Sequence, residues 1–184
     1  MSREVYTKSK MEITIDFKED LGVEEINDSV IRDQVGQAII DLIIDRTQSG
    51  KTMDGGSFAS YSPKYAQKKG VGVGDVDLTL TSDMLDSLDI IRSNSNSITI
   101  GVDQSDQVPK AYNHQVGDTL PKRPWLGVNK DELSDLAEAF SSELEPGPSI
   151  PVESNFFSQK TDEDTEKEIE AFARLLAETG LDFG

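Results

Sequence analysis

The sequence predicts a domain that combines helices with antiparallel strands, followed by a separate C-terminal helix. Two kinds of pattern support this prediction. Apolar and polar residues alternate over residues 11–17 and again over 97–102, which is typical of half-buried strands. Apolar residues recur at helical spacing over 31–43, which is typical of an amphipathic helix.

The first predicted element is the strand over residues 11–17. Side chains of a strand point alternately to its two faces, so every second residue lies on the same face. The face that we expect to be buried carries Met11, Ile13, Ile15 and Phe17.

The second element is a long helix that starts after Asn27 or Asp28 and ends before Gly50. Either side chain can cap it, because a short side-chain oxygen accepts hydrogen bonds from the free amides of the first turn. A glycine just beyond the last turn is the usual C-terminal signal. The apolar stripe of this helix, which we expect at the centre of the core, consists of Ile31, Val35, Ala38, Ile39, Leu42 and Ile43.

Residues 50–74 form a long Gly-rich connection, with a short helix expected at about 64–68. Connections of this length inside a compact domain are usually functional or partly disordered. This connection is also the basic part of the chain, because four lysines with few acidic neighbours gather in it: Lys51, Lys64, Lys68 and Lys69. We therefore expect it to contact an oppositely charged part of a neighbouring copy.

A short helix with a hydroxyl N-cap is predicted over 81–88, and a β-hairpin follows it. The strands of the hairpin are expected at 88–92 and 97–102, and the polar turn 93–96 joins them. Residues 110–117 show no clear preference for helix or strand.

The last helix of the main domain is predicted over 130–143. Asn129 is its expected N-cap, and Glu132 is placed to complete a capping box. The apolar stripe of this helix consists of Leu133, Leu136, Ala137, Phe140 and Leu144.

The segment just before that helix contains Trp125, the only tryptophan of the chain, next to Leu126. We expect a hydrophobic staple that fixes the loop to the core, with Pro124 stiffening the approach. Arg123 is then expected to present its charge to a neighbouring molecule.

A Pro-rich linker over 146–160 separates a main domain over 1–145 from a C-terminal segment over 161–184. The segment is predicted to be an acidic amphipathic helix, which Thr161 caps and Gly180 ends. Its apolar face carries Ile169, Phe172, Ala173 and Leu176. Because the main domain does not need this face for its own core, we expect it to dock on a partner.

The composition limits the chemistry of the chain. Its 184 residues carry a formal net charge of -17, with no cysteine and with His114 as the one histidine. Disulfides, Cys-based metal sites and multi-His zinc sites are therefore excluded, and we expect no metal and no cofactor. A chain this acidic is not expected to bind nucleic acid over its whole surface, because phosphate binding needs Lys and Arg.

No apolar run approaches the length of a membrane span, and residues 1–5 hold no apolar stretch of the signal-peptide kind. We therefore expect no contact with a membrane. The protein is expected to be made and used in a cytoplasm, or packed into a particle that is assembled there.

Three segments invite an enzymatic interpretation, and none is favoured. Residues 49–52 match the end of a phosphate-binding loop, but the required first glycine is replaced by Asp45, whose charge would repel phosphate. Residues 70–74 lack the full dinucleotide-binding fingerprint. His114 would need a nucleophile and an orienting acid, which composition alone cannot identify. We interpret His114 as structural and expect no catalytic residue.

The order of the segments resembles the phage virion-morphogenesis or tail-completion family over about residues 28–144. The resemblance rests on the long helix and on four segments that follow it: 61–68, 78–88, 110–117 and 123–127. Ser82 stands where the family often has glycine, and Trp125 where it often has phenylalanine.

This resemblance implies an α+β fold, in which a small, mainly antiparallel sheet packs on the long helix. It also implies a hexameric or dodecameric ring of identical subunits in the neck or tail end of a virion assembled in the host cytoplasm. Such rings contact neighbouring neck, connector or tail proteins and let DNA pass without sequence-specific binding. The family-motif residues with implied structural roles are Leu80, Met84, His114, Gly117, Pro124, Trp125 and Leu126.

We place the subunit and partner contacts on the basic connection, on Arg123 and on the C-terminal helix. The candidate residues are Lys51, Tyr61, Lys64, Tyr65, Lys68, Arg123, Ile169, Phe172 and Leu176. Two other classes of function remain open. One is a soluble, non-enzymatic binding or regulatory module that engages a partner through its acidic helix, and the other is an acidic hydrolase.

Overall fold

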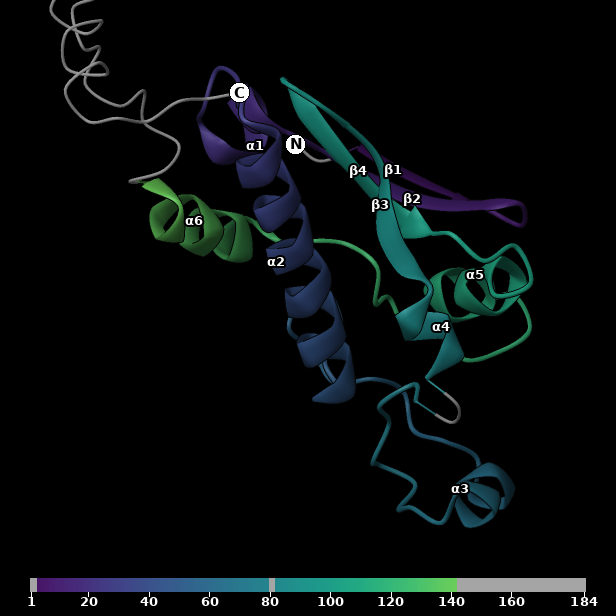
Figure 1. The fold of residues 1–184 in the computed structure, drawn as a ribbon. Coiled ribbons are helices and arrows are strands. Elements are labelled where there is room, and N and C mark those ends of the chain that lie inside the picture. Colours follow the sequence, from purple (N-terminus) through teal and green to yellow (C-terminus); the bar gives the residue numbers. More distant parts are fainter. Residues whose placement is uncertain (1–2, 80–81, 142–184) are drawn as a thin grey trace, which may run out of the picture. The chain divides into compact units, whose positions relative to one another are not determined.

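A computed structural model describes residues 3–79 and 82–141 of the chain, all within a unit that spans Met1–Glu145 (Figure 1). The predicted linker over 146–160 and the predicted helix over 161–184 lie outside the described residues. The elements in chain order are β1 (Arg3–Thr7), β2 (Lys10–Asp16), α1 (Phe17–Leu21), α2 (Ser29–Gln48), α3 (Pro63–Lys69), α4 (Asp83–Asp86), β3 (Leu88–Asn94), β4 (Ser97–Val102), α5 (Val108–Val116) and α6 (Lys130–Ala139).

The four strands form one antiparallel sheet in the order β1-β2-β4-β3, and the long helix α2 packs on β3 and β4 (Figure 1). The predicted α+β fold is therefore confirmed. Strand β2 is central, and its predicted buried face is also confirmed, because Met11 is 1% exposed and Ile13 and Ile15 are fully buried. Phe17 is buried as predicted, but it begins α1 instead of ending the strand.

The hairpin of β3 and β4 is confirmed with one irregularity. The first strand continues to Asn94, two residues beyond the prediction, and its register shifts between Ile90 and Arg92. The turn narrows to residues 95–96, because Asn94 still pairs with Ser97.

Helix α2 begins after Asp28, whose side-chain Oδ1 accepts a hydrogen bond from the amide of Val30 at 2.8 Å. Its buried face includes Val35, Ile39 and Ile43 from the predicted stripe. The helix lies close to the sheet at Gly36. A Cβ atom added to this glycine would lie 2.5 Å from the Cδ1 atoms of both Ile90 and Ile98, so any side chain here would force these two isoleucines to shift.

Two elements near the N-terminus were not predicted, namely the edge strand β1 and the short helix α1. Helix α1 forms because the Asp16 side chain accepts hydrogen bonds from the amides of Lys18 and Glu19, and it ends at Gly22 in the left-handed conformation. The ambiguous segment 110–117 belongs to helix α5, which ends at Gly117 with φ 78°.

Two predictions about helix ends are wrong. Ser82 precedes α4 but has φ 60° and forms no side-chain capping hydrogen bond, so the predicted hydroxyl cap is not made there. Helix α6 ends at Ala139, before the predicted 143. Its capping box is confirmed, because Asn129 and Glu132 each accept a hydrogen bond from the backbone amide of the other, at 3.0 and 2.9 Å.

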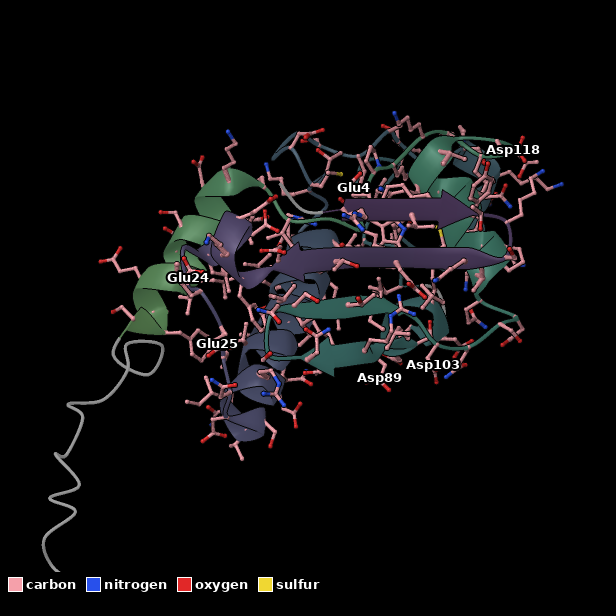
Figure 2. All side chains as sticks on the ribbon, turned by 90° about the horizontal axis from the view of Figure 1, so that it is seen from above. Glu4, Glu24, Glu25, Asp89, Asp103 and Asp118 are labelled. Atoms are coloured by element: carbon pink, nitrogen blue, oxygen red, sulfur yellow. The ribbon has the colours of Figure 1, made fainter. Side chains whose placement is uncertain are left out.

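The second face of the sheet carries polar side chains. In the view of Figure 2 the strands lie in front of α2. On this face the carboxylate of Glu12 pairs with Lys10 at 2.9 Å and with Arg92 at 2.7 Å, and the hydroxyls of Thr14 and Thr99 lie 3.0 Å apart. Pairing between facing charges and hydroxyls stabilises the sheet and provides partners for Glu12 and Thr99, which are largely buried.

Replacing Gly36 with valine should destabilise the domain. Helix propensity alone would favour the change, since glycine is among the poorest helix formers. The added methyl groups would instead meet Ile90 and Ile98, and such overpacking costs about 1–3 kcal/mol. Urea unfolding of Gly36→Val should show this loss. The matched control is Gly74→Val, because a Cβ atom at Gly74 would meet nothing within 4 Å. Equal stability of the two variants would contradict the close approach.

Candidate interaction surface

Helix α3 lies at the centre of the connection between α2 and α4, which we name the α3 segment (residues 50–79), and it lies beyond the main body of helices and strands (Figure 1). The sequence explains this helix. Ser62 accepts a hydrogen bond from the amide of Tyr65, Pro63 occupies the first turn, and Gly70 ends the helix with φ 79°.

The α3 segment is anchored to the domain by its own apolar side chains. The buried residues are Phe58, Tyr61, Ala66, Val76 and Leu78. Backbone hydrogen bonds within the segment hold its own parts together. The amide of Tyr61 donates to the carbonyl of Val73 at 2.8 Å, and the amide of Phe58 donates to Gly50 at 3.0 Å. The segment is therefore a fixed part of the fold, and not the partly disordered connection that its glycine content allows.

Arg123 is the main polar support of this segment. Its guanidinium donates to the carbonyls of Ala59 at 2.7 Å and Ser60 at 2.9 Å, and it lies 5.3 Å from the ring centre of Tyr61. The side chain is 3% exposed. The expectation that Arg123 presents its charge to a neighbouring molecule is therefore wrong, because the guanidinium is buried and hydrogen-bonded to backbone carbonyls of its own chain.

Tyr61 is the second predicted contact residue that lies in the interior. Its hydroxyl donates to the carboxylate of Asp77 at 3.2 Å and accepts from the amide of Leu78 at 3.2 Å. Lys69 forms an ion pair with the same carboxylate. Burial alone would raise the pKa of Asp77, but the hydrogen bonds from Lys69 and Thr79 outweigh it and lower the pKa to about 2.

The residues that remain for contact with another molecule are fewer than predicted. Lys51, Lys64 and Lys68 are exposed, whereas Lys69 is bound to Asp77. Lys64 and Lys68 stand four residues apart on α3 and so share one side of the helix. Tyr65 is half-buried, with its ring centre 4.8 Å from that of Tyr61.

The same segment also exposes an apolar side chain. Val73 is 48% exposed and follows α3 in the same segment. We name Lys64, Lys68 and Val73 together the α3 patch, because all three are exposed side chains of the α3 segment. The predicted contact residues Ile169, Phe172 and Leu176 lie outside the described residues.

Three of the family-motif residues lie in the interior of the domain. Met84, Trp125 and Leu126 are fully buried, and Leu80 lies outside the described residues. The carbonyl of Pro124 accepts from the amide of Met53 at 2.9 Å. Trp125 fixes its loop to the core as expected. It is not part of a hydrophobic staple, because the two staple positions lie directly before the Asn129 cap and four residues after it, and other residues occupy them.

Three residues that the sequence did not single out hold this loop. Gln115 accepts from the amides of Trp125 at 2.9 Å and Leu126 at 3.0 Å, and it donates to the Leu126 carbonyl at 2.9 Å. Arg46 donates to the carbonyls of Trp125 at 2.7 Å and Gly127 at 2.9 Å. The hydroxyl of Tyr6 donates to Leu126 at 2.6 Å. Gln115 lies inside one of the family-like segments. That was the only feature of the sequence that pointed to any of these three residues.

His114 lies beside the support of the α3 segment. Its backbone carbonyl accepts from the amide of Arg123 at 2.7 Å, while its ring Nδ1 is buried without a hydrogen-bond partner in the described part of the chain. Burial, followed by the charges of Arg123 and Lys110, lowers the pKa of His114 to about 4. The imidazole is therefore neutral at pH 7.

The described residues contain no group of three or more His, Asp or Glu side chains that could hold a metal ion. No helix in the same residues is long and apolar enough to cross a membrane. Comparison of the chain with protein-family models, with curated proteins and with solved structures gave no match.

Replacing Arg123 with glutamine should loosen the α3 segment before the rest of the domain. The carbonyls of Ala59 and Ser60 would lose a charged donor, and one such bond contributes about 1.5–3 kcal/mol. Hydrogen exchange at the amides of Tyr61 and Gly70 should accelerate about 10- to 100-fold, as such a loss of local stability implies. The matched control is Lys122→Gln, which changes an exposed neighbouring charge. Unchanged exchange in the Arg123 variant would show that the guanidinium does not support the segment.

Stability should fall as the pH falls from about 6.5 to about 4, and His114 should account for part of that fall. The folded-state pKa is below the ordinary value of 6.5, so the unfolded chain binds the proton more tightly in this window. Above pH 6.5 the ring is neutral in both states and costs no stability, whereas by pH 4 the loss of stability reaches the order of 3 kcal/mol. Urea unfolding of the wild type and of His114→Gln over this range should give curves that diverge with acid. Parallel curves would contradict a neutral, buried His114.

Proposed function

We propose that this chain is a structural, non-enzymatic subunit of a tailed-phage virion, and that it forms a homo-oligomeric ring in the neck or tail end. The ring completes the tail or joins it to the head and lets DNA pass. The order of the family-like segments supports this proposal, and so does the way in which those segments pack together.

The observation that carries the proposal is the convergence of segments that are far apart in sequence. Arg123 binds the backbone next to Tyr61, and its own amide donates to His114. Trp125 donates from its ring nitrogen to the carbonyl of Ala111 at 3.4 Å. The family-like residues thus hold the α3 segment in a fixed position, as a subunit needs if that segment contacts a neighbour.

The distribution of charge also favours association between copies. The acidic residues labelled in Figure 2 come from different parts of the domain, among them β1, β3 and the connections after α1 and α5. The α3 patch is basic. A ring closed by rotation needs two different, complementary surfaces on every copy, which surfaces of opposite charge provide.

The net charge of -17 suits the proposed passage of DNA. A channel wall rich in carboxylates repels the phosphate backbone, so DNA can move through it without being held.

The purified full chain should form particles that contain several copies, which sedimentation velocity and native mass spectrometry can measure. A chain that ends at Glu145 should assemble more weakly, because it lacks the apolar face predicted over the C-terminal segment. Its unfolding transition should match that of the main domain in the full chain. Monomers or dimers of the full chain at every concentration would contradict the ring and favour a soluble binding module. Equal assembly of the two chains would contradict a role of the C-terminal segment in assembly.

A further inference from the structure

The described part of the domain contains a groove of about 840 Å³ where the start of β1, helix α1 and the start of α6 meet. Residues that line it are Glu4, Glu19, Asp20, Met53, Val128, Asn129, Lys130 and Leu133. Its volume is in the range of ligand pockets, about 300–1,000 Å³, so it can take a few side chains and not a whole helix.

The groove has an apolar part and a charged part. Met53, Val128 and Leu133 supply the apolar part, and both Val128 and Leu133 are largely buried. The charged part holds three carboxylates, from β1 and α1, against the single ammonium of Lys130. The lining side chains thus carry more acidic than basic groups, and an occupant that complements them is cationic with an apolar component.

The α3 patch has this chemistry. Lys64 and Lys68 are exposed and share one side of the helix, and Val73 adds an exposed apolar side chain. The C-terminal segment of the chain is a poorer fit to an acidic groove, because between Asp162 and Glu170 acidic residues far outnumber the single Lys167.

The two surfaces of one copy do not meet. Figure 1 shows α1 and α6 at one end of the domain and α3 at the other. Both ends are anchored, α3 by Arg123 and the start of α6 by an ion pair of 2.7 Å between Arg46 and Glu132. An α3 patch that reaches the groove must therefore belong to another copy.

We propose that the acidic groove of one copy receives the α3 patch of the next copy, so that the copies associate head to tail. This contact rests on the proposed ring and specifies which surfaces form its interface. The same pair of surfaces repeats between every two neighbours, and each copy uses one of them on each side.

The absence of cysteine from the chain allows a direct test by disulfide trapping. One full-length variant carries Gln67→Cys, which places a thiol on α3 and keeps both lysines. A second carries Glu19→Cys at the groove and bears a size tag. The two are mixed under mild oxidation, and the mixed disulfide is measured by gel. The matched control replaces the groove variant with Asp103→Cys, an exposed position elsewhere on the domain (Figure 2).

The mixed disulfide should form several-fold more with the groove variant than with the Asp103 control. Adding Lys64→Glu and Lys68→Glu to the α3 variant should reduce it to the control level, because the groove would then meet like charge. Equal yields at Glu19 and Asp103 would overturn the proposed contact. So would a predominance of disulfides between two α3 variants, because these would indicate that like surfaces face each other.

The mass of the wild-type particle separates this contact from the proposed function. If the wild type forms a ring but the mixed disulfide does not form, the groove contact is contradicted and the proposed ring is not. A mixed disulfide without any closed particle supports the contact and contradicts the ring.

Discussion

The backbone of residues 125–127 lies inside the domain, and its hydrogen bonding is the constraint on which the rest of the structure depends. A buried amide or carbonyl without a partner costs about 1–3 kcal/mol. The amide group of Gln115 and the guanidinium of Arg46 satisfy this stretch from two sides. Because Arg46 belongs to α2 and Gln115 to α5, the stretch joins these helices to α6, which begins three residues later. Burial, with a contribution from the carboxylate of Glu4, raises the pKa of Tyr6, which keeps its hydroxyl protonated as a third donor.

The position of α3 follows from this joint. Pro124 and Arg123 directly precede the buried stretch. Because that stretch is held in place, the positions of the Pro124 carbonyl and of the Arg123 side chain are restricted as well. Pro124 accepts from Met53 at the start of the α3 segment, and Arg123 holds the carbonyls of residues 59–60. A basic helix that lies beyond the main body is thus kept in place by contacts at the centre of the domain. This arrangement is what allows a long, Gly-rich connection to serve as a defined surface instead of a mobile loop.

The sequence predicted the elements whose burial follows a simple period, such as β2 and α2. It did not predict β1, because this edge strand has no apolar face: Val5 is 37% exposed, while Glu4 points to the side that lines the groove. The candidate surface was predicted in outline, since the lysines of the α3 segment were identified. Arg123 was misplaced because a charged residue is usually on the surface, and only the fold shows that carbonyls from 63 residues away surround it. The role of Gln115 could not be predicted from hydrophobic periodicity either, because it depends on a loop that passes beside this residue in the fold.

The charges of the chain decide between the two ways in which identical copies can associate. When one surface alone lies on a two-fold axis it meets its own copy, so an α3 patch would face a second α3 patch, or an acidic groove a second groove. Both arrangements place like charges together, in addition to the general repulsion between chains of charge -17. Salt screens that general repulsion beyond about 8 Å at physiological ionic strength, whereas groups in direct contact still interact. The attractive arrangement is therefore the one that joins unlike surfaces. In the proposed association, contacts between unlike surfaces can pair reciprocally in a two-fold dimer, close into a ring or continue as a filament. The rotation between neighbours, which the anchored positions of groove and α3 patch define, selects which of these three forms.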